Sequence, residues 1–211
     1  DTRNPWDPTR TPGGSSGGAS VAAITGMAAL NVGSDGGGSI RMPSAFCGTF
    51  GLKATLALVP LYPPDGSGLL SHVGPITRTV RDCAHMMAAV AGPDPREIYP
   101  TQDDESSWLA GLEDGVAGMR IAYSPTYGGA SVDPQIAEAV RRTAHLLEHL
   151  GAEVEEVDPG HPDCRDAFLV LWDAALGRIV DPLTDEQRAL CDPGLIETWE
   201  RFGIFLKVGC R

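Results

Sequence analysis

The segment 119–157, MRIAYSPTYGGASVDPQIAEAVRRTAHLLEHLGAEVEEV, decides the fold class. Both of its ends, residues 119–123 and 152–157, predict β-strands. Between them, Asp133-Pro134 predicts a helix start, because aspartate caps the N-terminus and proline fits the first turn. Apolar residues then recur every three or four positions, as on one face of a helix. A strand–helix–strand unit of this length implies parallel strands joined by a right-handed crossover, and therefore an α/β protein.

Composition limits the possible function classes. The 211 residues fit about one domain, and a hydrophobic fraction of 42% is too high for a disordered chain. The 28 acidic and 16 basic residues give a net charge of −12, which argues against a nucleic-acid-binding surface. We see no apolar run long enough to span a membrane and no secretory signal at the start. These features predict a cytoplasmic protein without membrane or nucleic-acid partners.

The thiol and imidazole side chains show no metal-binding pattern. The odd number and scattered spacing of the cysteines favour reduced thiols over disulfides or a zinc site. His145 and His149 lie one helical turn apart, but the residues between them lack the zinc-protease pattern. We therefore expect exposed helix histidines, and neither a metal nor a cofactor. The five cysteines are Cys47, Cys83, Cys164, Cys191 and Cys210.

Local patterns predict the remaining elements. Thr79 and Asp82 resemble a capping pair at the start of a helix, and residues 93–107 are polar and acidic, as on a surface. Predicted helices cover residues 18–29, 43–50, 79–91, 165–178 and 184–203, a short strand covers 30–33, and a long ordered loop covers 55–75.

Glycine is concentrated between residues 13 and 51, which hold eleven of the 26 glycines. Two motifs lie there, GGSSGG at 13–18 and GSDGGGSIR at 33–41. A phosphate-binding loop is disfavoured because no lysine lies near either motif. A nucleophile elbow at residues 14–18 is disfavoured because no strand precedes it.

A third interpretation uses both motifs together. Ser39 follows three glycines after a buried strand, so that consecutive backbone N–H groups can converge on one point as an oxyanion hole. Serine is a weak nucleophile and needs a base. Ser15 could relay its proton if a lysine supports it.

The two motifs and their surroundings closely resemble the amidase signature family. The resemblance implies amide hydrolysis on an α/β/α sandwich with a mixed, largely parallel sheet, and no cofactor. It is dense over a signature core at residues 4–53 and looser over 74–95. Its segments are 4–7, 13–18, 33–43, 47–53 and 74–82.

The resemblance also implies residue roles. Ser39 is the acylated nucleophile, and Ser15 is the serine held by a cis peptide bond. The N–H groups of Gly36, Gly37, Gly38 and Ser39 form the oxyanion hole. Ser16 supports the site by hydrogen bonding, Asp35 and Arg41 form a pair that fixes the loop, and Cys47 packs in the core.

The general-base lysine is the main departure. In the family it lies well upstream of the Ser15 motif, whereas the lysines here are Lys53, which the resemblance makes structural, and Lys207, which has no motif. We therefore expect residues 1–211 to be an internal part of a longer amidase domain, and to have little activity alone. The expected substrate is a small-molecule amide.

Two alternatives remain. The first is the amidotransferase subunit that acts on mischarged tRNA, in which we expect an Asp-Gln pair before Gly74-Pro75; this chain reads Leu-Leu-Ser-His-Val over residues 69–73. The second is a non-catalytic member of the fold. In the loop before Gly74, Leu69, Leu70 and His72 either line the acyl pocket or belong to a plain surface loop.

Overall fold

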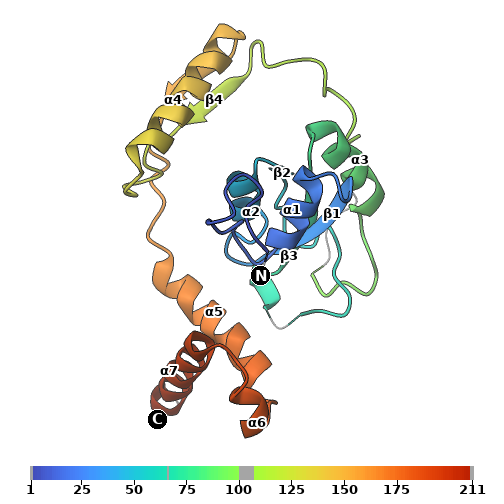
Figure 1. Ribbon diagram of the computed structural model, residues 1–211. Coiled ribbons are helices and arrows are strands. Elements are labelled where there is room, and N and C mark those ends of the chain that lie inside the picture. Colours follow the sequence, from blue (N-terminus) through green and yellow to red (C-terminus); the bar gives the residue numbers. More distant parts are fainter. Residues whose placement is uncertain (1, 66, 100–106, 210–211) are drawn as a thin grey trace. The chain divides into compact units, whose positions relative to one another are not determined.

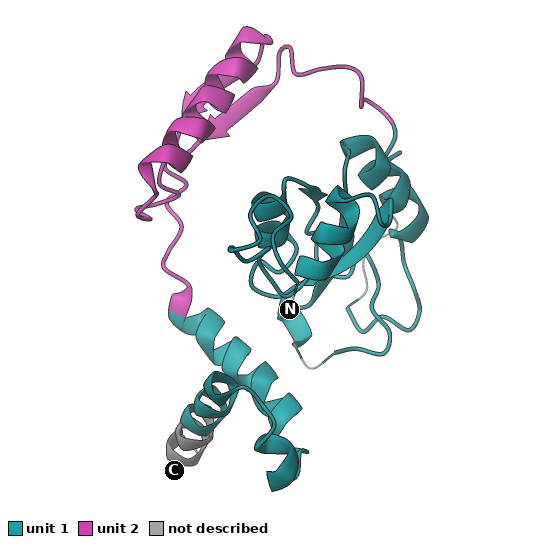
Figure 2. Ribbon diagram, viewed as in Figure 1, with its two compact units in different colours: residues 1–109, 166–211 teal, residues 110–165 magenta. Residues whose placement is uncertain are grey.

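The computed structural model describes residues 2–65, 67–99 and 107–209, which divide into two compact units (Figures 1 and 2). Unit 1 comprises residues 1–109 and 166–211, and unit 2 comprises residues 110–165. Cys210 and part of the predicted surface segment 93–107 lie outside the described residues. No helix within the described ranges is long and apolar enough to cross a membrane.

Unit 2 is the predicted strand–helix–strand unit. It contains β4 (Arg120–Tyr123), α4 (Pro134–His149) and β5 (Glu153–Glu156). The two strands pair in parallel, with Ile121 opposite Val154. Asp133 caps α4 by accepting a hydrogen bond from the Gln135 N–H at 2.8 Å. The strand–helix–strand order and the parallel pairing predicted from residues 119–157 are confirmed.

Unit 1 contains a three-stranded antiparallel sheet. Its strands are β1 (Leu30–Asp35), β2 (Phe50–Gly51) and β3 (His72–Thr77), in the order β1-β3-β2. The α/β class is therefore confirmed, but the described strands form one antiparallel and one parallel sheet, and not a single mixed, largely parallel sheet. Within the described strands, parallel pairing is confined to β4 and β5.

The prediction of a continuous loop over residues 55–75 is wrong. The segment contains a short 3₁₀ helix, η1 (Gly68–Leu70), and the first four residues of β3, which is the central strand of its sheet. Proline usually disfavours a central strand because it cannot donate to a neighbour. Here the Pro75 carbonyl accepts from the Leu52 N–H at 3.1 Å, and Gly74 has no Cβ where the Leu52 carbonyl approaches.

Helices and irregular segments make up the rest of unit 1. The first helix ends five residues earlier than predicted, because Gly26 adopts a φ of +77° and turns the chain. The predicted helix 184–203 is two helices, because proline at 193 disfavours helical backbone in the residue before it. The unit-1 helices are α1 (Gly17–Ile24), α2 (Arg41–Cys47), α3 (Val80–Val90), α5 (Arg165–Val180), α6 (Asp185–Arg188) and α7 (Pro193–Gly209).

Two apolar clusters fix these elements. Ala23 of α1 packs with Ile40 and Ile76, and all three are fully buried. This cluster joins α1 and β3 to the turn that follows β1. A second cluster packs Cys83 and Met87 of α3 onto the chain after β2. Thr79 caps α3 by accepting from the Asp82 N–H at 3.0 Å, as its sequence predicts.

A substitution at Gly33 of β1 tests how tightly the first apolar cluster is packed. A Cβ at this position would lie 2.8 Å from Ile76 Cδ1 and 2.9 Å from both Ile40 Cγ1 and Ser16 Oγ. We expect Gly33→Ala to lower the free energy of unfolding by about 1–3 kcal/mol, the usual cost of overpacking. The measurement is chemical denaturation of the complete gene product. Gly18→Ala in α1 is the control, since its Cβ would meet nothing within 4 Å. Equal losses in the two variants would contradict the packing argument.

Candidate active site

The site is built around the carboxylate of Asp35, the last residue of β1, whose side chain is fully buried. Its Oδ1 accepts from the Gly38 N–H at 2.6 Å and from Arg41 Nη2 at 2.8 Å. Its Oδ2 accepts from Arg41 Nε at 2.9 Å and from the N–H groups of Ile40 and Arg41 at 3.1 and 3.3 Å. Both oxygens are thus satisfied, and the predicted Asp35–Arg41 pair is present.

These bonds keep Asp35 ionised. Burial alone raises the pKa of Asp35, but the hydrogen bonds from Arg41 and from the backbone N–H groups outweigh it and hold the pKa well below its usual value. The same pairing raises the pKa of Arg41. The turn is therefore fixed by a charged pair at neutral pH.

The carboxylate also explains an error at α2. The sequence predicted a helix from Pro43 to Phe50, whereas α2 spans Arg41–Cys47. Asp35 satisfies backbone N–H groups just before and at the first turn, which starts the helix earlier. Pro43 is tolerated inside this turn because its N–H would be unpaired there. Gly48, with a φ of +76°, ends the helix.

Ser16 joins the two glycine-rich motifs. Its N–H donates to the Ser39 carbonyl at 3.2 Å. Its hydroxyl donates to the Ser34 carbonyl and accepts from the Ser34 N–H, each at 3.2 Å. The 13–18 turn is therefore bound to both the end of β1 and the turn containing Ser39. This is the supporting position expected for Ser16.

The peptide bond between Gly14 and Ser15 is cis, as the resemblance implies. Ser15 is exposed and Ser39 is partly buried. The peptide that joins Ser15 to Ser16 contacts the Ser39 backbone, so the fold brings the two candidate serines into one region. A nucleophile elbow needs a strand directly before its serine, and residues 11–15 form no strand.

The four predicted oxyanion donors are not equivalent. The Gly38 N–H is occupied by Asp35, so its assignment as a free donor is wrong. Within the described residues, no hydrogen-bond partner is found for the N–H groups of Gly36, Gly37 or Ser39. The sequence could not separate Gly38 from its neighbours, because the difference arises from a carboxylate folded back onto the turn. Three donors remain as candidates.

Asn4 and Trp6 have structural positions that sequence reasoning did not assign. Asn4 Nδ2 donates to the Phe46 carbonyl at 3.1 Å, and Trp6 Nε1 donates to the Cys47 carbonyl at 2.7 Å. Both bonds satisfy carbonyls at the C-terminal end of α2, which the helix leaves unpaired. The N-terminal segment therefore holds α2 in place. In the sequence, the side-chain N–H donors of the 4–7 segment were the signal that could have indicated this role.

The remaining candidates are structural. Lys53 Nζ donates to the Ala54 carbonyl at 3.0 Å. Cys47 is fully buried, as predicted, and its thiol lies 3.5 Å from the Pro12 carbonyl. Burial raises the pKa of Cys83 to about 11, which keeps this thiol protonated. His145 Nδ1 lies 2.8 Å from Glu148 Oε2 on an exposed face of α4. Among the described residues, no group of three metal-binding side chains is found.

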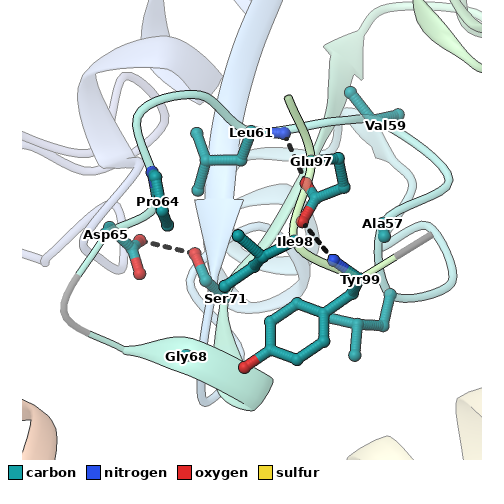
Figure 3. A pocket seen from close by; sticks show the side chains of 11 residues that line it. Ala57, Val59, Leu61, Pro64, Asp65, Gly68, Ser71, Glu97, Ile98 and Tyr99 are labelled. Atoms are coloured by element: carbon teal, nitrogen blue, oxygen red, sulfur yellow. Dashed lines mark hydrogen bonds between the residues drawn. The ribbon is translucent and has the colours of Figure 1, made fainter. Parts of the chain in front are cut away.

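A small cavity lies away from the two serines (Figure 3). Residues from segments 56–65, 68–71 and 97–99 line it, and its volume of about 20 Å³ suits one water molecule. Glu97 joins the two segments by accepting from the N–H groups of Leu61 and Tyr99 at 2.8 and 3.0 Å. The cavity thus lies where Glu97 holds the loop before β3 in place by hydrogen bonds. It is too small for an amide substrate.

Comparison with known proteins decides the family. The amidase family model matches residues 1–186, which include both glycine-rich motifs, Asp35 and Arg41. The chain belongs to the amidase family. Solved structures agree: a bacterial aryl acylamidase of the amidase signature family is 31% identical with a TM-score of 0.87, over 96% of this chain and 44% of that one.

Curated relatives of this amidase-family chain include amidotransferase subunits. A glutamyl-tRNA(Gln) amidotransferase subunit of Moorella thermoacetica is 43% identical over 163 residues, which cover 77% of this chain and 34% of that protein. The crystal structure of the corresponding Thermotoga maritima protein matches with a TM-score of 0.77 and 33% identity, over 98% of this chain and 46% of that one. The chain spans about a third of the length of the curated relatives it matches.

The Asp35 network predicts a pH-dependent stability. Because the folded-state pKa of Asp35 is depressed, its contribution is complete above its unfolded pKa of about 4 and is lost as the pH falls further. We expect Asp35→Asn to cost roughly 2 kcal/mol of unfolding free energy at pH 7, because the Asp35 carboxylate is buried and hydrogen-bonded while the Arg41 side chain that pairs with it is 55% exposed. The difference in unfolding free energy between this variant and the unaltered protein should become smaller below pH 4. Urea denaturation across this pH range measures it.

Asp94→Asn is the matched control for this experiment. Asp94 makes the same two-bond contact with Arg96, at 2.9 and 2.7 Å, but on the surface. Solvent screens such a pair, so its loss should change the unfolding free energy far less. An Asp35→Asn variant as stable as Asp94→Asn would show that the carboxylate does not fix the turn.

Proposed function

We propose that the complete gene product hydrolyses small-molecule amides by acyl transfer to Ser39. The supporting observation is the arrangement of the Ser39 turn. Asp35 and Arg41 fix this turn, and the Ser16 N–H binds the Ser39 carbonyl. Membership of the amidase family supports the same chemistry.

The proposed reaction needs no oxidant or reductant. Ser15 accepts the Ser39 hydroxyl proton while a neutral lysine upstream of residue 1 accepts the proton of Ser15. Ser39 Oγ bonds to the amide carbon, and the carbonyl oxygen becomes an oxyanion. The oxyanion re-forms the carbonyl as the C–N bond breaks, Ser15 protonates the leaving nitrogen, and the protonated lysine returns its proton to Ser15. Water attacks the resulting ester, releases the carboxylic acid and returns a proton to Ser39.

The oxyanion would be held by backbone N–H groups. Gly36, Gly37 and Ser39 are the candidate donors, since Asp35 occupies the fourth. A backbone donor in such a hole contributes about 3–4 kcal/mol of transition-state stabilisation in other acyl-transfer enzymes. Asp35 and Arg41 do not act on the substrate in this scheme, because they bind each other.

An amidotransferase subunit is the second candidate, and the curated relatives support it. The net charge of −12 and the residues before Gly74 favour a separate amidase. His72, at one of the positions where we expect the Asp-Gln pair of the amidotransferase, lies against the Asp35 carbonyl, with Nδ1 3.2 Å from the oxygen. The position that distinguishes the two candidates thus contacts the end of β1.

Loss of the Ser39 hydroxyl tests the proposed reaction. We expect Ser39→Ala to lower kcat/KM on aryl and aliphatic amides by about 10³-fold or more, because the acyl-enzyme cannot form. Ser15→Ala should also reduce kcat strongly, but mass spectrometry should still detect a Ser39 adduct with a reactive acyl donor. Ser131→Ala, an exposed position in unit 2, is the control. Amide hydrolysis that persists in Ser39→Ala would refute the nucleophile.

Affinity purification separates the two candidate functions. We expect the tagged protein to purify as an active amidase without other subunits. Co-purification of further subunits, together with glutamine-dependent transfer to glutamyl-tRNA(Gln), would instead establish the amidotransferase function.

A further inference from the structure

Two aromatic side chains of α5 pack against the glycine turn. A Cβ on Gly37 would lie 3.0 Å from Phe168 Cζ, and a Cβ on Gly36 would lie 3.2 Å from Trp172 Cζ3. The two rings stack on each other with centroids 5.7 Å apart and an interplanar angle of 24°. The rings therefore contact the two residues whose N–H groups have no partner within the described residues.

Leu70 and Met42 also pack against the glycine turn. The Leu70 carbonyl oxygen would lie 3.5 Å from a Cβ on Gly36, and Met42 Cε would lie 3.1 Å from a Cβ on Gly38. Each glycine thus has a larger side chain where its own would be. Glycine makes this close approach possible, but it also leaves the backbone free to move unless neighbours restrain it.

The known contacts restrain only part of the turn. One hydrogen bond to Asp35 fixes Gly38, and the Ser16 N–H fixes Ser39 by donating to its carbonyl. No such bond is found for the N–H of Gly36 or Gly37 in the described part of the chain. Packing by the α5 rings therefore restrains these two peptides, together with Leu70 at Gly36.

We infer that Phe168 and Trp172 are positioning residues, which hold the Gly36 and Gly37 N–H groups toward the oxyanion. This inference rests on the proposed function of the site. The rings act through the backbone of the turn and not by binding the substrate. An oxyanion hole needs donors that are fixed before charge develops, and a shift of about 1 Å can cost about 100-fold in rate.

Kinetics of ring-deletion variants test the inference. We expect Phe168→Leu and Trp172→Leu in the complete gene product to lower kcat for 4-nitroacetanilide about 10- to 100-fold, with KM within about threefold. Affinity for benzeneboronic acid, which forms a tetrahedral adduct with serine, should fall in parallel. Affinity for benzoate, which is planar, should not change. Val170→Ala, an exposed position on the same helix, is the control.

The outcomes separate this inference from the proposed function. A raised KM with unchanged kcat would show that the rings bind substrate, and would overturn the inference. Unaltered kcat and boronate affinity would also overturn it, while an inactive Ser39→Ala variant would leave the proposed function standing. Activity that persists in Ser39→Ala would refute both. If Trp172→Leu does not fold, Trp172→Phe gives the same comparison with a smaller expected loss, because one ring is kept.

Discussion

The buried carboxylate of Asp35 accepts five hydrogen bonds, and the site depends on them. Three come from the backbone N–H groups of Gly38, Ile40 and Arg41, and two come from the Arg41 side chain. An isolated carboxylate could not be buried here, since its desolvation would be too costly. Because Arg41 and the N–H groups offset that cost, the end of β1, the turn with Ser39 and the start of α2 form one unit.

Much of this arrangement was predictable from local sequence. Asp133-Pro134 and the apolar spacing after it fixed the β4-α4-β5 unit, since capping and helical periodicity are local properties. The serine and glycine motifs indicated Ser15 and Ser39, whereas Ser16 and the Asp35–Arg41 pair were expected from the family resemblance. The resemblance supplied the roles of these residues, which spacing alone could not. The catalytic roles themselves remain predictions.

The errors arise where distant segments decide the local structure. Gly74-Pro75 resembles a loop, yet it lies in a central strand because Leu52 pairs with the carbonyl of Pro75. Gly38 resembles its neighbours, but its N–H is taken by a side chain from β1. Phe168 lies far along the chain in a helix of weak pattern, so nothing in the sequence connects it with Gly37. Such contacts depend on tertiary structure.

The same pairing makes the site electrostatically suitable for a developing oxyanion. A bare carboxylate at Asp35 would repel negative charge on the nearby turn, and such repulsion is strong where water is excluded. The Arg41 guanidinium forms two bonds with that carboxylate and neutralises it. Asp35 can therefore organise the backbone through hydrogen bonds without imposing a net negative charge. In the proposed mechanism, the Gly36, Gly37 and Ser39 N–H groups then supply the local positive potential. A turn built on a neutral side chain would avoid the repulsion, but it would lose the charge-assisted bonds that hold Gly38 and the start of α2.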